Sequence, residues 1–198
     1  MIELPPRAAS LRRFWFGGDR ATRFRGAWFR KDPAFDAELR HRFSDDMGLA
    51  RAGRLESWQT SPAGCVALLL LLDQLPRNLH RGFPDAFSSD AQARAVADAA
   101  IARGFDRELP VIERVFVYLP FEHSEAMVDQ QRSLALFGAL PVAAPGFDAQ
   151  AHAMAMSAAR RHLEIIERFG RFPHRNPALG RATTPAEDAF LREPFSAF

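Results

Sequence analysis

The stretch from Cys65 to Leu72 contains no polar residue, and it leads directly into Asp73 and Gln74. A helix that is apolar on all sides has to be buried, so we expect this stretch at the centre of the fold. It is far shorter than the roughly 20 apolar residues that cross a bilayer. Asp73 is then carried into the core or to its edge, where a carboxylate needs a cation or hydrogen-bond donors. The fold therefore has to bring polar partners to the end of its most buried helix.

Start and stop signals for helices recur along the rest of the chain, and no stretch shows the alternation that is typical of strands. Asp32-Pro33 and Ser61-Pro62 each combine an N-cap residue with proline at the first helical position. The first of these helices carries one apolar stripe, made by Phe35, Leu39, Phe43 and Met47, before a stop at Gly53. We expect Pro76 to end the second helix, because proline is not tolerated in a helix interior.

Further helices are expected later in the chain. They run from a capping box at Ser89 and Gln92 to Gly104, from Pro110 to Val117, from about Phe121 to Leu140, from Asp148 to near Gly170, and from a capping box at Thr184 and Glu187 to Leu191. This makes about seven or eight helices of ordinary length. Because no linker or low-complexity segment interrupts them, the sequence predicts a single all-α domain over residues 1–198.

Charge and cysteine content limit the possible partners and setting. The net charge is only +2, with 26 basic and 24 acidic residues. This near balance argues against a continuous basic face along a phosphate backbone, so nucleic acid is not an expected partner. Cys65 is the only cysteine, which excludes an intrachain disulfide and favours a buried, unreactive thiol. Since residues 1–10 contain no apolar signal core, we expect a cytoplasmic protein that does not enter a membrane.

Three polar segments, residues 72–78, 120–125 and 168–176, stand inside otherwise apolar sequence. Each sets charged groups beside large hydrophobic side chains, and the simplest compensation is that the segments meet one another. In the first segment, Asp73 has Arg77 as a local partner four residues later, and an arginine of the third segment is the long-range candidate. Asp73 is then either one half of a structural ion pair or a carboxylate that contacts a ligand.

The second segment carries acids and a histidine. One face of the helix expected from about Phe121 would hold Glu122, Glu125 and Asp129. Clustered carboxylates can raise one another's pKa and serve as general acid and base, although a solvated face has the same pattern. His123 shares its stripe with apolar residues and Gln130, which fits a hydrogen-bonded core histidine as well as a catalytic one. No metal or other cofactor is expected, because the spacing of these glutamates lacks the Glu-x-x-His of di-iron bundles, and the sequence contains neither His-Glu-x-x-His nor a cysteine cluster.

The third segment is the richest in cations. Its polar groups, with their near neighbours, are Arg168, Arg171, His174, Arg175, Asn176 and Arg181. Gly170 can end the preceding helix in a left-handed cap, and Pro173 and Pro177 restrict the loop that follows. Arginines on such a loop can clamp a phosphate or carboxylate. They can equally serve as counter-ions for the acids of the other two segments.

These motifs resemble an uncharacterised bacterial family called domain of unknown function 924. The resemblance covers nearly the whole chain in order. It is carried by Phe14-Trp15-Phe16-Gly17, Trp28-Phe29, Leu72-Asp73-Gln74 with Pro76-Arg77-Asn78, the segment 119–125, Asp129-Gln130, and the segment 168–176 with Leu179-Gly180-Arg181. The resemblance implies an all-helical fold similar to tetratricopeptide-repeat proteins, made of antiparallel helix hairpins. It implies no activity.

Three hypotheses for function stay open. In the first, the protein binds or senses an anionic small molecule or peptide, which Arg171, Arg175 and Arg181 grip. In the second, it is a hydrolase-type enzyme whose general acid and base come from His123, Glu122 and Glu125. In the third, the polar segments are structural ion pairs in a scaffold for a protein partner. Besides the three candidate catalytic residues, the candidate ligand-binding residues are Asp73, Gln74, Arg77, Asn78, Arg81, Asp129, Gln130, Arg168, Arg171, His174, Arg175, Asn176 and Arg181.

Overall fold

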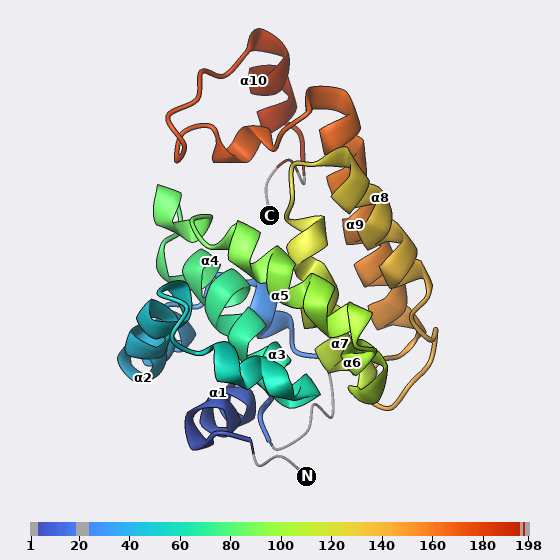
Figure 1. The fold of residues 1–198 in the computed structure, drawn as a ribbon. Coiled ribbons are helices and arrows are strands. Elements are labelled where there is room, and N and C mark those ends of the chain that lie inside the picture. Colours follow the sequence, from blue (N-terminus) through green and yellow to red (C-terminus); the bar gives the residue numbers. More distant parts are fainter. Residues whose placement is uncertain (1–3, 19–23, 195, 197–198) are drawn as a thin grey trace.

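The computed structural model describes residues 4–18, 24–194 and 196, and all regular structure in that part of the chain is helical (Figure 1). The α-helices are α1 (Pro6–Phe16), α2 (Pro33–Arg51), α3 (Pro62–Leu69), α4 (Leu75–Leu79), α5 (Asp90–Ala102), α6 (Phe105–Glu108), α7 (Val111–Glu122), α8 (Met127–Gly138), α9 (Ala149–Phe169) and α10 (Pro185–Leu191). The π-helix η3 (Leu70–Gln74) and the 3-10 helices η1 (Gly26–Phe29), η2 (Glu56–Thr60), η4 (Pro84–Ala86) and η5 (Pro173–Arg175) complete the set. The predicted single all-α domain is confirmed, whereas the tetratricopeptide-like detail stays a prediction.

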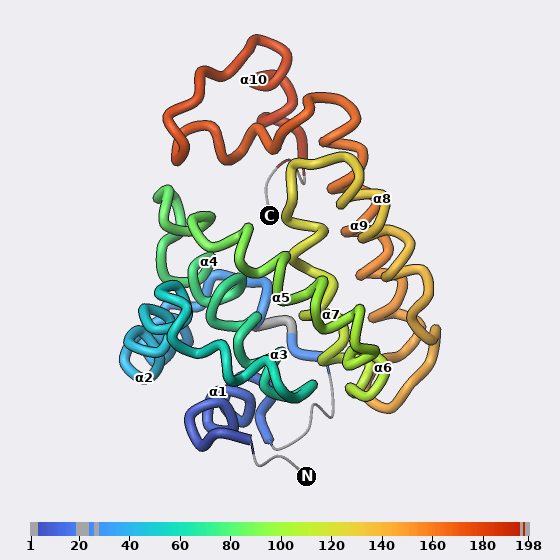
Figure 2. The backbone as a smooth tube through the Cα atoms, viewed as in Figure 1, coloured from blue at the N-terminus to red at the C-terminus, as the bar shows by residue number. Residues whose placement is uncertain are grey.

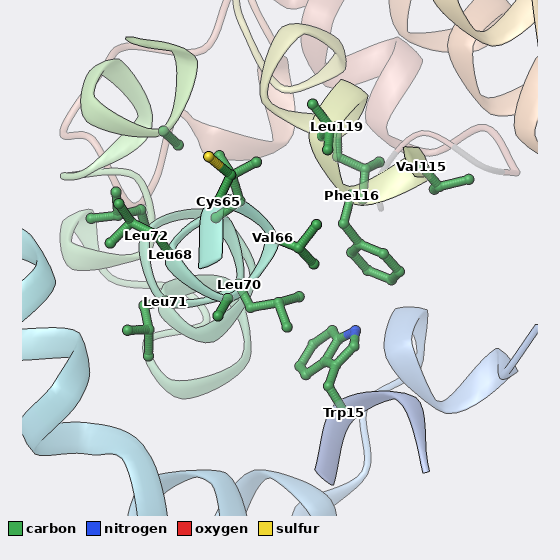
Figure 3. Close-up of a cluster of buried hydrophobic side chains, with 14 of the residues drawn as sticks. Trp15, Cys65, Val66, Leu68, Leu70, Leu71, Leu72, Val115, Phe116 and Leu119 are labelled. Carbon is green, nitrogen blue, oxygen red and sulfur yellow. The ribbon is translucent and has the colours of Figure 1, made fainter. Parts of the chain in front are cut away.

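The apolar stretch that precedes Asp73 forms the centre of the fold, as predicted. Every side chain from Cys65 to Leu72 is buried. Figure 3 shows Val66 and Leu70 on the side of this helix that faces Trp15 and Phe116. Burial also raises the pKa of the Cys65 thiol to about 11, which leaves it protonated and unreactive.

Pro76 does not end the helix, contrary to the prediction. The chain continues from α3 through η3 into α4, which ends at Leu79. Proline removes an N–H donor and crowds the carbonyl group four residues earlier, which here belongs to Leu72. In the wider π turn the N–H of Leu75 bonds to the Leu70 carbonyl. The Leu72 carbonyl accepts a hydrogen bond from Ser89 Oγ at 2.6 Å. The helix therefore passes the proline with this carbonyl satisfied.

The helix predicted from about Phe121 to Leu140 is also wrong, because the structure has two helices there. α7 ends at Glu122 and α8 begins only at Met127. Gln130 Nε2 donates to the carbonyl oxygens of Glu122 and Ser124, both at 2.6 Å, and so pairs carbonyl groups that a helix end leaves free. The acids expected on one helix face consequently lie on different elements.

Other boundary signals are mostly confirmed. The N-caps at Asp32, Ser61, Asp148 and Thr184 each accept a backbone N–H. The capping box of Thr184 and Glu187 is also present. The predicted box at Ser89 and Gln92 is wrong, because Ser89 bonds to the Leu72 carbonyl and Gln92 to the carbonyl of Arg51. Helix α1 was not predicted, since its N-cap, Pro5, has no side-chain cap to announce it.

The buried hydrophobic residues divide into a main cluster and a small one near the C-terminus. The small cluster consists of Ile165, Ile166, Phe172 and Phe190. It joins the end of α9 to η5 and α10. Figure 2 shows this C-terminal part of the chain beyond the end of the α8–α9 hairpin. Hydrogen bonds from the Phe172 N–H and from Arg181 to Glu125 connect this part to the main body, and several candidate functional residues lie near them.

Candidate functional site

Side chains from several elements close a ring of contacts at the end of the buried helix. His123 Nδ1 lies 2.8 Å from Asp73 Oδ1, and Arg77 Nη1 lies 3.1 Å from the same oxygen and 2.9 Å from Asp90 Oδ1. Arg175 Nη1 lies 3.7 Å from Asp90 Oδ2, and its guanidinium carbon lies 4.5 Å from the centre of the Phe172 ring. His162 closes the ring, because its ring centre lies 5.4 Å from that of Phe172 and 6.2 Å from that of His123. We name these seven residues the contact ring. All three polar segments contribute to it.

Asp73 is fully compensated by its neighbours, although its side chain is only 1% exposed. His123 and Arg77 contact Oδ1, and Gln74 Nε2 donates to Oδ2 at 2.7 Å. Burial by itself would raise the pKa of Asp73. The charge of Arg77 and the contacts from His123 and Gln74 outweigh burial and hold this pKa below its ordinary value. The expected local partner Arg77 is therefore present, whereas the long-range partner is His123 instead of an arginine.

Asp73 also fixes the tautomer of His123. An ionised carboxylate only accepts hydrogen bonds, so Nδ1 of His123 carries the proton and donates a hydrogen bond to Asp73. Burial and the positive charge of Arg77 lower the pKa of His123, so the ring is neutral at neutral pH and Nε2 holds a lone pair. No other residue in the described part of the chain hydrogen-bonds to Nε2, and the side chain remains 13% exposed. His123 thus offers a nitrogen that can accept a hydrogen bond or a proton.

Arg175 is the least compensated charge of the contact ring. Its side chain is 6% exposed, yet it donates no hydrogen bond to any described residue, and its Nε is buried without a partner. The nearest described carboxylate, Asp90, is already bound by Arg77 through both oxygens, at 2.9 and 3.0 Å. Phe87 and Phe172 lie 4.6 and 4.5 Å from the guanidinium carbon and contribute cation–π contacts. Burial and the charge of Arg77 lower the pKa of Arg175 to about 10.

A second buried acid lies beside His162. Glu122 Oε1 is 3.6 Å from His162 Nδ1, and this nitrogen is 2.9 Å from the carbonyl oxygen of Ala158. Burial and the negative charge of Asp73 raise the pKa of Glu122 to about 8. Burial lowers the pKa of His162 well below its ordinary value. At neutral pH Glu122 is therefore mostly protonated and His162 is neutral, so this carboxyl group holds a proton that it can donate.

Glu125 fastens the C-terminal loop to the turn after α7. Arg181 donates to both of its oxygens, at 2.8 and 3.0 Å, and the backbone N–H of Phe172 donates to Oε1 at 2.8 Å. Burial would raise the pKa of Glu125, but these donors outweigh it and lower the pKa. Glu125 and Arg181 therefore hold each other beside the contact ring.

Several other candidate residues have partners outside the contact ring. Asn78 and Arg81 bind Asp36 of α2, and Gln130 caps the end of α7. Asp129 accepts a hydrogen bond from Ser124 Oγ at 2.6 Å, and Arg168 lies over the rings of Phe169 and Phe190. Arg171 binds Glu187 at 2.6 and 2.8 Å, and Asn176 Nδ2 lies 3.4 Å from Thr183 Oγ1. His174 lies beside Phe172, and burial lowers its pKa to about 3. These residues support the polypeptide around the contact ring.

Sequence reasoning missed Asp90, His162, Phe87 and Phe172 as members or neighbours of the site. His162 had a signal, because it lies on the apolar side of α9 with Ile165 and Ile166, where a polar ring needs an explanation. Asp90 looked like an ordinary acidic residue in the first turn of a helix. Its role became apparent only from the fold, which brings Arg77 and Arg175 to it.

The described residues contain neither a candidate metal site nor a helix that could span a membrane. No group of three or more His, Cys, Asp and Glu side chains among them is arranged to hold a metal ion. No helix among them is long and apolar enough to cross a bilayer. A cavity of about 200 Å³ lies between α2, α3 and α5, and it contains no residue of the contact ring.

The chain is similar to a protein family whose function is unknown. The family described as bacterial proteins of unknown function, DUF924, matches residues 11–195. A solved structure of a protein of unknown function from Agrobacterium tumefaciens is 40% identical in sequence, with a TM-score of 0.80 over 93% of this chain and 96% of that chain. No curated protein matches the sequence.

Proposed function

The chain belongs to the DUF924 family of bacterial proteins of unknown function, and we propose that its contact ring binds a small anionic molecule through Arg175. The supporting observation is a buried guanidinium that donates no hydrogen bond to any described residue. A buried cation is costly unless it is both paired and hydrogen-bonded. A carboxylate or phosphate supplies both, because its oxygens match the paired N–H groups of arginine.

The arrangement of charge in the contact ring supports the same proposal. Its two arginines and two aspartates balance formally, but Arg77 takes the close contacts from both Asp73 and Asp90. Among the described residues, Arg175 keeps only an ionic contact to Asp90 at 3.7 Å. The guanidinium of Arg175 is therefore the place where an added anion gains most. Arg171 and Arg181, which we expected to grip the ligand as well, are already bound to Glu187 and Glu125.

A thermal-shift screen of the purified protein against anionic metabolites, each with and without divalent metal, tests this proposal. A ligand at about 100 times its dissociation constant adds about 2.7 kcal/mol to the stability of the folded state, which is easily measured. We expect at least one anion to raise the melting temperature of the wild type and of Arg168→Ala, a control on an exposed arginine of the same region. The shift should disappear in Arg175→Ala. A shift that survives in Arg175→Ala, or no shift with any anion, contradicts the proposal.

A second candidate function is general acid–base catalysis, which the pairing of His123 with Asp73 favours. In this hypothesis His123 Nε2 accepts a proton, the protonated Glu122 donates one, and Arg175 stabilises negative charge. Glu125 is not part of it, because Arg181 and the backbone of Phe172 occupy both of its oxygens. A His123→Gln variant that still binds the anion but loses turnover would support an enzyme over a binding protein.

The remaining alternative is a scaffold for a protein partner in which the contact ring is a structural ion-pair network. It is separated from the first proposal by the stability of Arg175→Ala, because removing one member of a buried pair costs about 3–5 kcal/mol. We also propose that the protein is cytoplasmic, and the single, buried thiol of Cys65 supports this location.

A further inference from the structure

We infer that the contact ring selects a small carboxylate that carries its own O–H or N–H donor, such as a hydroxy acid. This inference rests on the proposed anion binding and adds the class of ligand to it. Within the described part of the chain, two side chains of the contact ring have hydrogen-bonding groups without partners, one a donor and the other an acceptor. Arg175 has N–H groups to donate, and His123 has a nitrogen that accepts.

The acceptor character of His123 follows from its hydrogen bond to Asp73. The carboxylate cannot donate, so the proton of the neutral imidazole sits on Nδ1, and Nε2 is left with a lone pair. The burial that lowers the pKa of His123 keeps it in this form at neutral pH. A ligand that meets Nε2 with a methyl or methylene group leaves the lone pair without a partner, which is unfavourable in a partly buried site.

His123 and Arg175 belong to the same set of contacting side chains. One side of the contact ring connects them through Asp73, Arg77 and Asp90, and the other connects them through His162 and Phe172. The contact ring therefore brings an acceptor, His123, and a donor, Arg175, into one cluster of side chains. A molecule that places a hydroxyl or amide N–H a few bonds from its anionic group can satisfy both residues at once.

The neighbouring charges favour a carboxylate over a phosphate. The carboxylates of Asp73 and Asp90 belong to the contact ring, and they repel a doubly charged ligand more than a singly charged one. The buried Nε of Arg175 leaves the two terminal nitrogens as its binding edge. Two parallel N–H groups at that edge match the two oxygens of a carboxylate.

The test is a comparison of butyrate with 2-, 3- and 4-hydroxybutyrate, measured by calorimetric or NMR titration at pH 7.5. These probes share one anionic group and one chain length, and they differ only in a hydroxyl donor. At least one hydroxybutyrate should bind about three- to ten-fold more tightly than butyrate, which is the usual contribution of one hydrogen bond. Equal binding of all four probes overturns the inference and leaves the proposed anion site intact. Binding of none of them also overturns the inference, and the thermal-shift screen against other anions then decides separately on the proposed anion site.

Variants at histidine identify the group that makes the difference. His123→Phe keeps a ring of similar size and removes the acceptor, while Asp73 retains Arg77 and Gln74 as partners. We expect this variant to bind butyrate and the preferred hydroxybutyrate equally. His152→Phe, on α9 beside Phe147, is the matched control and should keep the wild-type preference. If the preference survives in His123→Phe, the inference fails. If that variant does not fold, the probe comparison in the wild type still decides.

Discussion

The buried charges at the two ends of the contact ring differ in how completely their neighbours pair them. At the η3 end, Asp73 has partners on both oxygens, from Arg77, His123 and Gln74. At the η5 end, Arg175 is almost as deeply buried, and its only ionic contact in the described part of the chain is 3.7 Å long. A buried charge that the protein pairs fully is typical of a structural ion pair. A buried charge that is only partly paired is typical of a ligand-binding site. Substitutions at the two ends should therefore affect different properties.

The largest effect on stability is expected at the η3 end. Asp73→Ala removes a buried carboxylate from Arg77 and His123 and leaves their hydrogen bonds unmade, so the free energy of unfolding should fall by about 3–5 kcal/mol. Urea denaturation followed by circular dichroism measures the change. A loss below about 1 kcal/mol would mean that Asp73 is not the structural anchor that its contacts indicate.

The next effect is a pH dependence that comes from Glu122. Its pKa is about 8 in the folded protein because of burial and the charge of Asp73, and it is about 4.3 in an unfolded chain. The folded state therefore binds more protons between these values, so stability should be highest below about pH 4.3 as far as this group is concerned, and should fall as the pH rises. Between pH 5 and 7 the loss should be on the order of 2 kcal/mol. Glu122→Gln, which mimics the protonated acid, should remove this dependence in denaturation measured at several pH values.

Ser89→Ala should have a smaller effect at the same end of the site. The hydroxyl of Ser89 donates to the Leu72 carbonyl, which the π-helix η3 and Pro76 leave without its usual helical partner. Removing the hydroxyl leaves that buried carbonyl unsatisfied, at a cost of about 1–3 kcal/mol. Ser88→Ala is a suitable control, because the neighbouring Ser88 is exposed and donates to the exposed carbonyl of Asp85. Equal losses in the two variants would show that the hydrogen bond does not support η3.

The elements that could be predicted from sequence are those fixed by local signals. Asp32, Asp148 and Thr184 cap the helices that follow them, and the apolar stretch before Asp73 is buried as its composition requires. The features that were missed depend on contacts far along the chain. Ser89 makes it possible for the helix to pass Pro76, and no local rule contains that contact.

The same distinction applies to the candidate site. Sequence indicated that the polar segments meet, and they do: Asp73 contacts His123, and Glu125 accepts the N–H of Phe172. The sequence could not show which of Arg171, Arg175 and Arg181 lacks a close carboxylate partner. In the folded chain Glu187 pairs with Arg171 and Glu125 pairs with Arg181. Such pairing is a property of the folded chain and not of residue type.

The smallest effect on stability, and the largest on binding, is expected at the η5 end. Arg175→Ala loses two cation–π contacts, each worth about 1 kcal/mol, but it also removes a buried cation that no described residue fully pairs. Because these contributions oppose each other, the free energy of unfolding should change by less than about 1 kcal/mol, as urea denaturation will measure. In the same variant the thermal shift caused by the anion should vanish. A loss comparable with that of Asp73→Ala would place Arg175 with the structural charges, and the difference between the two ends of the contact ring would then be one of geometry without a consequence for function.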